Sequence, residues 1–219
     1  MKPALRKLLE IGSAPFANNT SGFEMDQLAT LGSCGIALRE VLTQKNGFFC
    51  FESALRIFPS ITTVTSWGLS EWNSHELWKI DYNGLANNYF CFAEDILGVQ
   101  FCIIEDGVVT FDPESAEVKR FASTLDEWAS KILASYNSMT GYRLAHEWQK
   151  LHGPLPARQR LMPKTPFVLG GEYELANLAA VDSVELMKYM GDLAHQIYRL
   201  PDGTKIKLVF AAKPRLDSK

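Results

Sequence analysis

The hydrophobic positions between residues 89 and 111 fall into three short runs separated by turn residues. Tyr89–Ala93 and Phe101–Ile104 are separated by the turn-like segment EDILG, and Asp106-Gly107 precedes the third run, Val108–Phe111. Short apolar runs bounded by turn signals are typical of strands in a β-meander. Apolar residues occupy both alternating sets of positions, which predicts strands that are covered on both faces.

Other segments follow a helical spacing or have cap signals. Helices are expected over Ala4–Ile11, over Gly35–Gln44 with Ser33 as a cap, and over Leu69–Ile80. A fourth helix is expected to begin after a cap at Ser123 or Thr124, and its inward face would carry Leu125, Trp128, Ile132 and Leu133. A fifth is expected over Tyr142–Leu151, with Leu144, Trp148 and Leu151 facing inward. Residues 48–58 are expected to be extended in part, and Glu117–Ala122 to form a further strand.

The last fifty residues suggest a β-rich extension. Leu178–Val181 is a strand candidate, and Asp182 and Glu185 form a capping box for a short helix that ends at Gly191. A hairpin is expected to pair Leu193–Leu200 with Lys205–Phe210 around a Pro-Asp-Gly turn.

Together these elements predict an α+β fold, with a central, mostly antiparallel sheet flanked by helices and a C-terminal helix plus β-hairpin extension. The domain boundaries predicted from the sequence are a core domain over residues 1–135, a helix and Pro-rich connecting arm over 136–170, and a β-rich C-terminal extension over 171–219.

Composition limits the class of protein. The 219 residues are 47% hydrophobic and 21% charged, which is typical of a globular core. The basic start lacks a long apolar segment, and no run approaches the ~20 apolar residues of a membrane span, so we expect a cytoplasmic protein with no membrane partner. The four cysteines match no zinc or redox spacing and predict free, buried thiols.

Charge is distributed unevenly along the chain. The net charge is only −3, but residues 71–117 hold ten acids against the single Lys79, which gives −9 for that segment. From Val118 onward, 15 basic residues oppose ten acids, a balance of +5. This asymmetry predicts one acidic surface that attracts a basic partner, and it argues against direct nucleic-acid binding.

The candidate partner-binding residues come from this acidic segment. They are Trp72, Glu94, Asp95, Glu105, Asp106, Asp112, Glu114 and Glu117. Two alternatives remain open: the acids are solvated turn residues, or Asp95, Glu105 and Asp106 converge as a metal or acid/base site. His146-Glu147 lacks the second histidine of H-E-x-x-H, and the four histidines are expected to be surface or hydrogen-bonded residues.

The stretch from about Gly35 to Ala134 carries a family resemblance. It contains the helix that ends at Asn46-Gly47, a tryptophan-bearing segment, NYFCFAEDILGVQFCI, and GVVTFDPESAEVKRFASTLDEWASKIL. In this order the segments resemble the SUKH (Smi/Knr-like) superfamily, which includes bacterial toxin-immunity proteins and fungal cell-wall regulators. The resemblance covers about half of the chain, and it brings no catalytic residue set and no cofactor.

The resemblance implies a cytoplasmic immunity protein that binds and neutralises a bacterial toxin. Combined with the charge asymmetry, it predicts a basic, nuclease-like toxin that is blocked sterically, with carboxylates occupying the place of nucleic-acid phosphates. The alternatives are an adaptor or regulatory scaffold that docks through the Pro-rich arm and basic tail, and a metal-dependent hydrolase.

Overall fold

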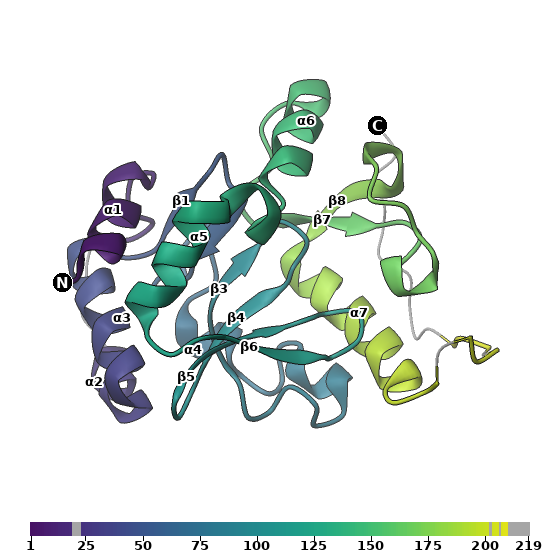
Figure 1. Cartoon of the computed structure of the whole chain (residues 1–219), viewed down its shortest axis with the longest axis horizontal. Coiled ribbons are helices and arrows are strands. Elements are labelled where there is room, and N and C mark those ends of the chain that lie inside the picture. The colour runs from purple at the N-terminus through teal and green to yellow at the C-terminus, as the bar shows by residue number, and fades with distance from the viewer. Residues whose placement is uncertain (19–22, 202, 206, 210–219) are drawn as a thin grey trace.

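The computed structural model describes residues 1–18, 23–201, 203–205 and 207–209, and it has the α+β architecture that the sequence predicts. A six-stranded antiparallel sheet lies between helices, followed by a two-stranded hairpin and a C-terminal helix (Figure 1). The strands of the large sheet are β1 (Phe48–Cys50), β2 (Leu55–Ile57), β3 (Phe90–Asp95), β4 (Gln100–Ile104), β5 (Gly107–Phe111) and β6 (Val118–Ala122). Each strand pairs with the one that precedes it in the chain.

The helices and the hairpin complete the fold. The α-helices are α1 (Pro3–Ile11), α2 (Phe23–Leu28), α3 (Gly32–Gln44), α4 (Leu69–Trp72), α5 (Leu125–Met139), α6 (Tyr142–His152) and α7 (Ser183–Ile197). Short 3₁₀ helices are η1 (Ala29–Leu31), η2 (Lys79–Tyr82), η3 (Phe167–Leu169) and η4 (Leu175–Asn177). The hairpin pairs β7 (Gln159–Pro163) with β8 (Leu178–Asp182). Among the described residues, no helix has the length and hydrophobicity needed to cross a membrane.

Helices cover both faces of the large sheet, as the two-sided hydrophobic pattern predicts. On one face, α5 places Trp128 against Phe92 and Phe101, with ring centroids 4.9 and 5.6 Å apart, and α1 packs on α5. On the other face lie α4, η2 and α7, where Met187 contacts Gln100 of β4. The sheet is therefore the middle layer of three.

Several predicted elements are confirmed with small shifts of their ends. These are the three meander strands, the strand before α5, and the helices α1, α3, α5 and α6. Within α6, however, Leu151 was expected to face inward and is instead 69% exposed. Thr124 caps α5 by accepting the Glu127 N–H (3.1 Å), and Asp182 caps α7 by accepting the Val184 N–H (2.8 Å). Ser33, however, lies inside α3 and is not its cap.

The helix expected over Leu69–Ile80 is wrong for most of its length. Helix α4 ends at Trp72, and only η2 forms near the other end. The cause is Asn73, whose side chain accepts the Cys91 N–H (2.7 Å) and donates to the Cys91 carbonyl (2.8 Å). These two bonds tie the chain to the start of β3 and end the helix there.

The hairpin expected from Leu193–Leu200 and Lys205–Phe210 is also wrong, because residues 193–197 belong to α7. In its second expected strand, positions 206 and 210 lie outside the described residues.

Helix α7 does not end at Gly191, where the helix was expected to stop. A Cβ atom there would lie 2.9 Å from Asp81 Cβ and 3.0 Å from a Tyr82 ring carbon. Gly191 therefore permits the close approach of α7 to η2 and is not a helix stop.

The predicted boundaries do not separate the hydrophobic core. Helix α5 continues past residue 135 to Met139, with a kink at Ser135. The predicted connecting arm contains strand β7, and the C-terminal segment contributes a 15-residue helix. The buried residues of α7, which include Val184, Met187, Met190 and Leu193, pack into the same core as the sheet.

Candidate functional site

Half of the predicted acidic surface is buried. Trp72, Glu94, Asp95 and Glu114 all lie in the interior. The expectation that these four line an exposed acidic face is therefore wrong. For Glu94 and Asp95 the physical reason is that β3 is covered on both faces, so that a charged residue in this strand points into the protein. Trp72 packs from α4 against the sheet and donates to Gln100, and Glu114 is covered by η3, whose N–H groups it accepts.

The other four predicted residues do not gather into one patch. Glu105 and Asp106 form the turn before β5, and Asp112 and Glu117 lie beyond its other end. A five-residue strand spans about 17 Å. Asp106 also pairs with Arg120 (2.6 Å), and Glu117 pairs with Lys119 (2.9 Å). These ion pairs reduce the negative potential that was expected to attract a partner.

The metal or acid/base alternative requires that Asp95, Glu105 and Asp106 converge. Asp95 ends β3 next to the start of β4, whereas Glu105 and Asp106 follow the other end of β4. In the described part of the chain, no group of three His, Cys, Asp or Glu side chains could hold a metal ion. The three acids are therefore separated by the length of a strand.

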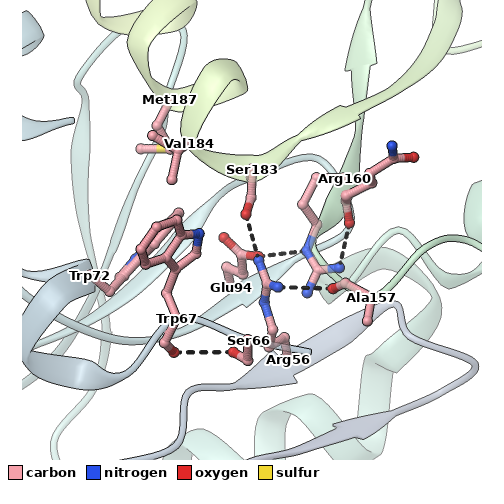
Figure 2. A network of polar contacts seen from close by, with 12 residues as sticks. Arg56, Ser66, Trp67, Trp72, Glu94, Ala157, Arg160, Ser183, Val184 and Met187 are labelled. Atoms are coloured by element: carbon pink, nitrogen blue, oxygen red, sulfur yellow. Dashed lines mark hydrogen bonds and ion pairs between the residues drawn. The ribbon is translucent and has the colours of Figure 1, made fainter. Parts of the chain in front are cut away.

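A network of buried charges surrounds Glu94 instead (Figure 2). Arg56 forms an ion pair with Glu94 Oε1 through Nη2, and Arg160 Nε lies 2.6 Å from the same oxygen. All three side chains are 0% exposed. Gln100 donates to Glu94 Oε2 (3.1 Å), and Trp72 Nε1 donates to Gln100 Oε1 (2.8 Å).

The strand register explains how these residues meet. Arg56 lies opposite Glu94, Glu94 lies opposite Gln100, and Gln100 lies opposite Phe111. Directly opposed residues share a face of the sheet. This row faces α7, from which the Ser183 hydroxyl accepts a bond from Arg56 Nη2 (2.9 Å).

The network keeps Glu94 charged. Burial alone would raise the pKa of Glu94, but Arg56, Arg160 and the bond from Gln100 together hold it below its ordinary value. Burial and the neighbouring Arg56 lower the pKa of Arg160 to about 9. Since the network is inaccessible to a macromolecule, its role is to hold β2, β3, β7 and α7 together.

Asp95 and Glu114 also bind main-chain groups. Asp95 Oδ1 accepts the N–H groups of Leu97 (2.8 Å) and Val99 (2.9 Å), which fixes the turn from β3 to β4. Glu114 accepts the N–H groups of Phe167 (3.1 Å) and Val168 (2.8 Å). Glu114 thus attaches η3 to the loop between β5 and β6.

A surface groove lies where these segments meet, and its volume is about 750 Å³. Its walls come from the β5–β6 loop, η3 and the C-terminal end of α7 with the chain that follows. Exposed apolar side chains gather along it: Val168, Leu169, Tyr198 and Leu200. Polar side chains, among them Ser115, Glu117 and Arg199, line the same hollow, so its surface is of mixed polarity. We call the whole hollow the apolar groove after its four exposed apolar side chains.

Charge around the apolar groove includes two of the predicted acids. Glu117 lines it, and Asp112 lies at the start of the same loop. The loop after η3 adds the exposed Glu172 and Glu174, held near by Tyr173, whose ring stacks on Phe167 at 3.8 Å. Arg199 also lines the groove, and Lys119 pairs with Glu117, so the charge at the edge of the groove is of mixed sign.

Three of the histidines make side-chain contacts of the expected kind. His146 Nδ1 lies 2.7 Å from Glu52 Oε2, His75 contacts Asn87 at 3.3 Å, and His195 contacts Asn83 at 3.4 Å. These contacts support the prediction that the histidines are surface or hydrogen-bonded residues.

The sequence interpretation missed the arginines of the network and the apolar groove. A signal existed for Arg56 and Arg160, because each interrupts a short apolar strand. A signal also existed for Val168 and Leu169, which stand between Pro166 and Gly170, in a segment too short to form a buried helix. Nothing in the sequence alone brings Tyr198 and Leu200 next to them.

Comparison with known proteins shows the fold but no family. No family model matches the chain, and no curated protein matches it. Among solved structures, the chain is similar to Atu4351 from Agrobacterium tumefaciens, with a TM-score of 0.52 and 11% identity over 84% of this chain and 86% of that one. At this identity the likeness concerns the fold alone.

Proposed function

We propose that this chain is an immunity-type binding protein that neutralises a bacterial protein toxin by covering a functional surface of the toxin. The observation that carries the proposal is the apolar groove, where four large exposed apolar side chains line one concave surface. Contiguous exposed apolar surface in a folded protein marks interaction sites. The resemblance of residues 35–134 to the SUKH superfamily supports the same function.

The composition of the apolar groove suits a protein partner. Tyrosine and arginine are enriched among residues that dominate binding energies, and Tyr89, Tyr198 and Arg199 all line the groove. Its walls are tied to the core by Glu114 and by the buried face of α7. A wall that is fixed before binding loses little conformational entropy on association.

The carboxylates near the groove support a basic partner such as a nuclease-like toxin. Asp112, Glu117, Glu172 and Glu174 lie on the segments that form or adjoin the walls. Carboxylates near a binding surface raise the association rate with a basic partner, most strongly at low salt. In this mechanism the apolar residues provide affinity and the acids provide steering.

The test is co-expression with the product of the adjacent toxin gene, together with a binding measurement on the purified proteins. Leu169→Asp places a charge in the apolar groove, so we expect an affinity loss of tenfold or more and loss of protection. Leu151→Asp is the matched control, because Leu151 is 69% exposed on α6 and does not line the groove.

If Leu169→Asp and Leu151→Asp bind the toxin equally well while both remain folded, the groove is not the interface. The adaptor alternative makes a different prediction. A pull-down from the native host would then recover a housekeeping complex in place of a toxin.

A further inference from the structure

Two buried cysteines face each other in the middle of the large sheet. Cys91 of β3 and Cys102 of β4 are directly opposed in the strand register, and their Sγ atoms lie 3.3 Å apart. Both side chains are buried. The other two cysteines are on separate elements, with Cys34 in α3 and Cys50 in β1.

The strand register places the two cysteines opposite each other, and the register shift in this strand pair lies on the other side of Cys91, toward Ala93. Opposed residues of antiparallel strands have Cα atoms about 4.5 or 5.5 Å apart, depending on the hydrogen-bonding position. Disulfides span Cα separations of about 4.4–6.8 Å. The sulfurs, now 3.3 Å apart, would have to approach to the S–S bond length of about 2.05 Å.

We propose that Cys91 and Cys102 form a disulfide site that becomes oxidised when the protein meets a disulfide oxidant such as oxidised glutathione. One cysteine, as the thiolate, attacks a glutathione sulfur and releases one reduced glutathione. The second thiolate then attacks the mixed disulfide and releases the other. The two protein thiols lose two protons and two electrons, and one oxidised glutathione becomes two reduced molecules.

Burial controls the rate of this oxidation. Burial raises the pKa of the Cys102 thiol well above its ordinary value, which suppresses the reactive thiolate in the native fold. Exchange therefore requires local opening of the β3–β4 pair. Oxidation during refolding, when both thiols are accessible, should be much faster than oxidation of the native protein.

The disulfide would close the segment between the two cysteines, which carries Glu94, Asp95 and Gln100. This segment supplies the carboxylate of the buried network and the turn between the strands. A covalent link here restricts the unfolded chain. The oxidised protein should therefore unfold at a higher urea concentration than the reduced protein.

The experiment is refolding of the reduced, denatured chain in a glutathione redox buffer, followed by alkylation of free thiols and peptide mass spectrometry. We expect two alkylated thiols in place of four, a mass lower by two hydrogen atoms before alkylation, and a linked peptide pair that contains Cys91 and Cys102. The native protein in the same buffer should give the same product more slowly.

Two variants make the result decisive. Cys91→Ser should abolish the linked peptide, whereas the control double variant Cys34→Ser/Cys50→Ser should keep it. The double variant contains only the proposed pair, so it decides the question even if Cys91→Ser does not refold. A folded double variant that keeps both thiols in oxidised glutathione, or a wild-type product with another pairing, would overturn the proposal.

Discussion

At Glu94 the chain buries a carboxylate between two guanidinium groups, and all three side chains are inaccessible to water. A buried ion pair adds little stability compared with apolar residues of the same shape, but removal of one partner leaves an uncompensated charge. Substitution of Glu94 should therefore lower the stability of the fold more than most other single substitutions, independently of any binding function.

Glu94→Gln should lower the free energy of unfolding by about 3–5 kcal/mol, because two buried cations lose their counter-charge while the volume is kept. Urea unfolding monitored by circular dichroism measures this loss. Glu105→Gln is the control: the residue is exposed in a turn, and its change should stay within about 0.5 kcal/mol. Equal effects of the two substitutions would contradict the buried network.

Asp95 should make stability depend on pH. Burial raises its pKa to about 8 in the folded protein, above the ordinary value of 3.8, so the folded state binds the proton more tightly than the unfolded state. The stabilisation is complete below about pH 4 and is lost as the pH rises through 8. Asp95→Asn keeps an oxygen for both main-chain bonds and removes the titration.

The stability of Asp95→Asn relative to wild type should therefore increase from pH 5 to pH 8. Urea unfolding at several pH values measures it. A difference that stays constant or falls over this range would show that Asp95 is ionised in the folded protein.

At the scale of elements, the turn between β3 and β4 docks against α7. Gly98 in this turn has φ +87°, and a Cβ there would lie 2.7 Å from Leu186 Cδ2. Leu186 is completely buried, so its side chain has little space into which to move. The turn therefore requires glycine for two reasons: its backbone has a positive φ, and a Cβ atom would collide with Leu186 of the helix that covers it.

Gly98→Ala should destabilise the protein more than Gly170→Ala does. Gly170 has the same φ, +87°, with ψ 16° in the left-handed region, and no atom lies within 4 Å of its Cβ position, so its substitution measures the backbone cost alone, about 1–2 kcal/mol. Overpacking against Leu186 should add about 1–3 kcal/mol at Gly98. Equal losses in thermal or urea unfolding would contradict the docking of the turn on α7.

Elements with a regular local signal could be predicted from the sequence, and elements that depend on distant partners could not. The strands of the meander and the capped helix α5 follow hydrophobic periodicity and cap residues. The length of α7 was missed because Gly191 resembles a helix stop until its contact with Asp81 and Tyr82 is known. In the sequence, Glu94 looks like an exposed acidic residue at the end of a strand, because its pairing with Arg56 and Arg160 depends on contacts between distant segments.

At the scale of the molecule, the C-terminal segment is part of the folding unit. Eight residues of α7 are buried, and Arg160 and Ser183 complete the network around Glu94. The large apolar side chains of α7 each stabilise the fold by about 1.5–3 kcal/mol, so together they contribute on the order of 10 kcal/mol. That amount equals the whole net stability of a typical domain.

A fragment of residues 1–135 should therefore fail to fold cooperatively, whereas a fragment of residues 1–201 should unfold in one transition like the full chain. Urea titration followed by tryptophan fluorescence distinguishes the two. A cooperative transition of the 1–135 fragment would show that the predicted core domain is autonomous.

The order of strands in the large sheet has a consequence for synthesis of the protein. Because each strand pairs with its predecessor, the sheet can assemble in chain order while later residues are still inside the ribosome, and its one long loop closure is the connection over residues 58–89 between β2 and β3. Arg160 and α7 are translated after all six strands, when Glu94 has already met Arg56. Until α7 docks, the row of charged side chains around Glu94 therefore stays uncovered on the growing sheet.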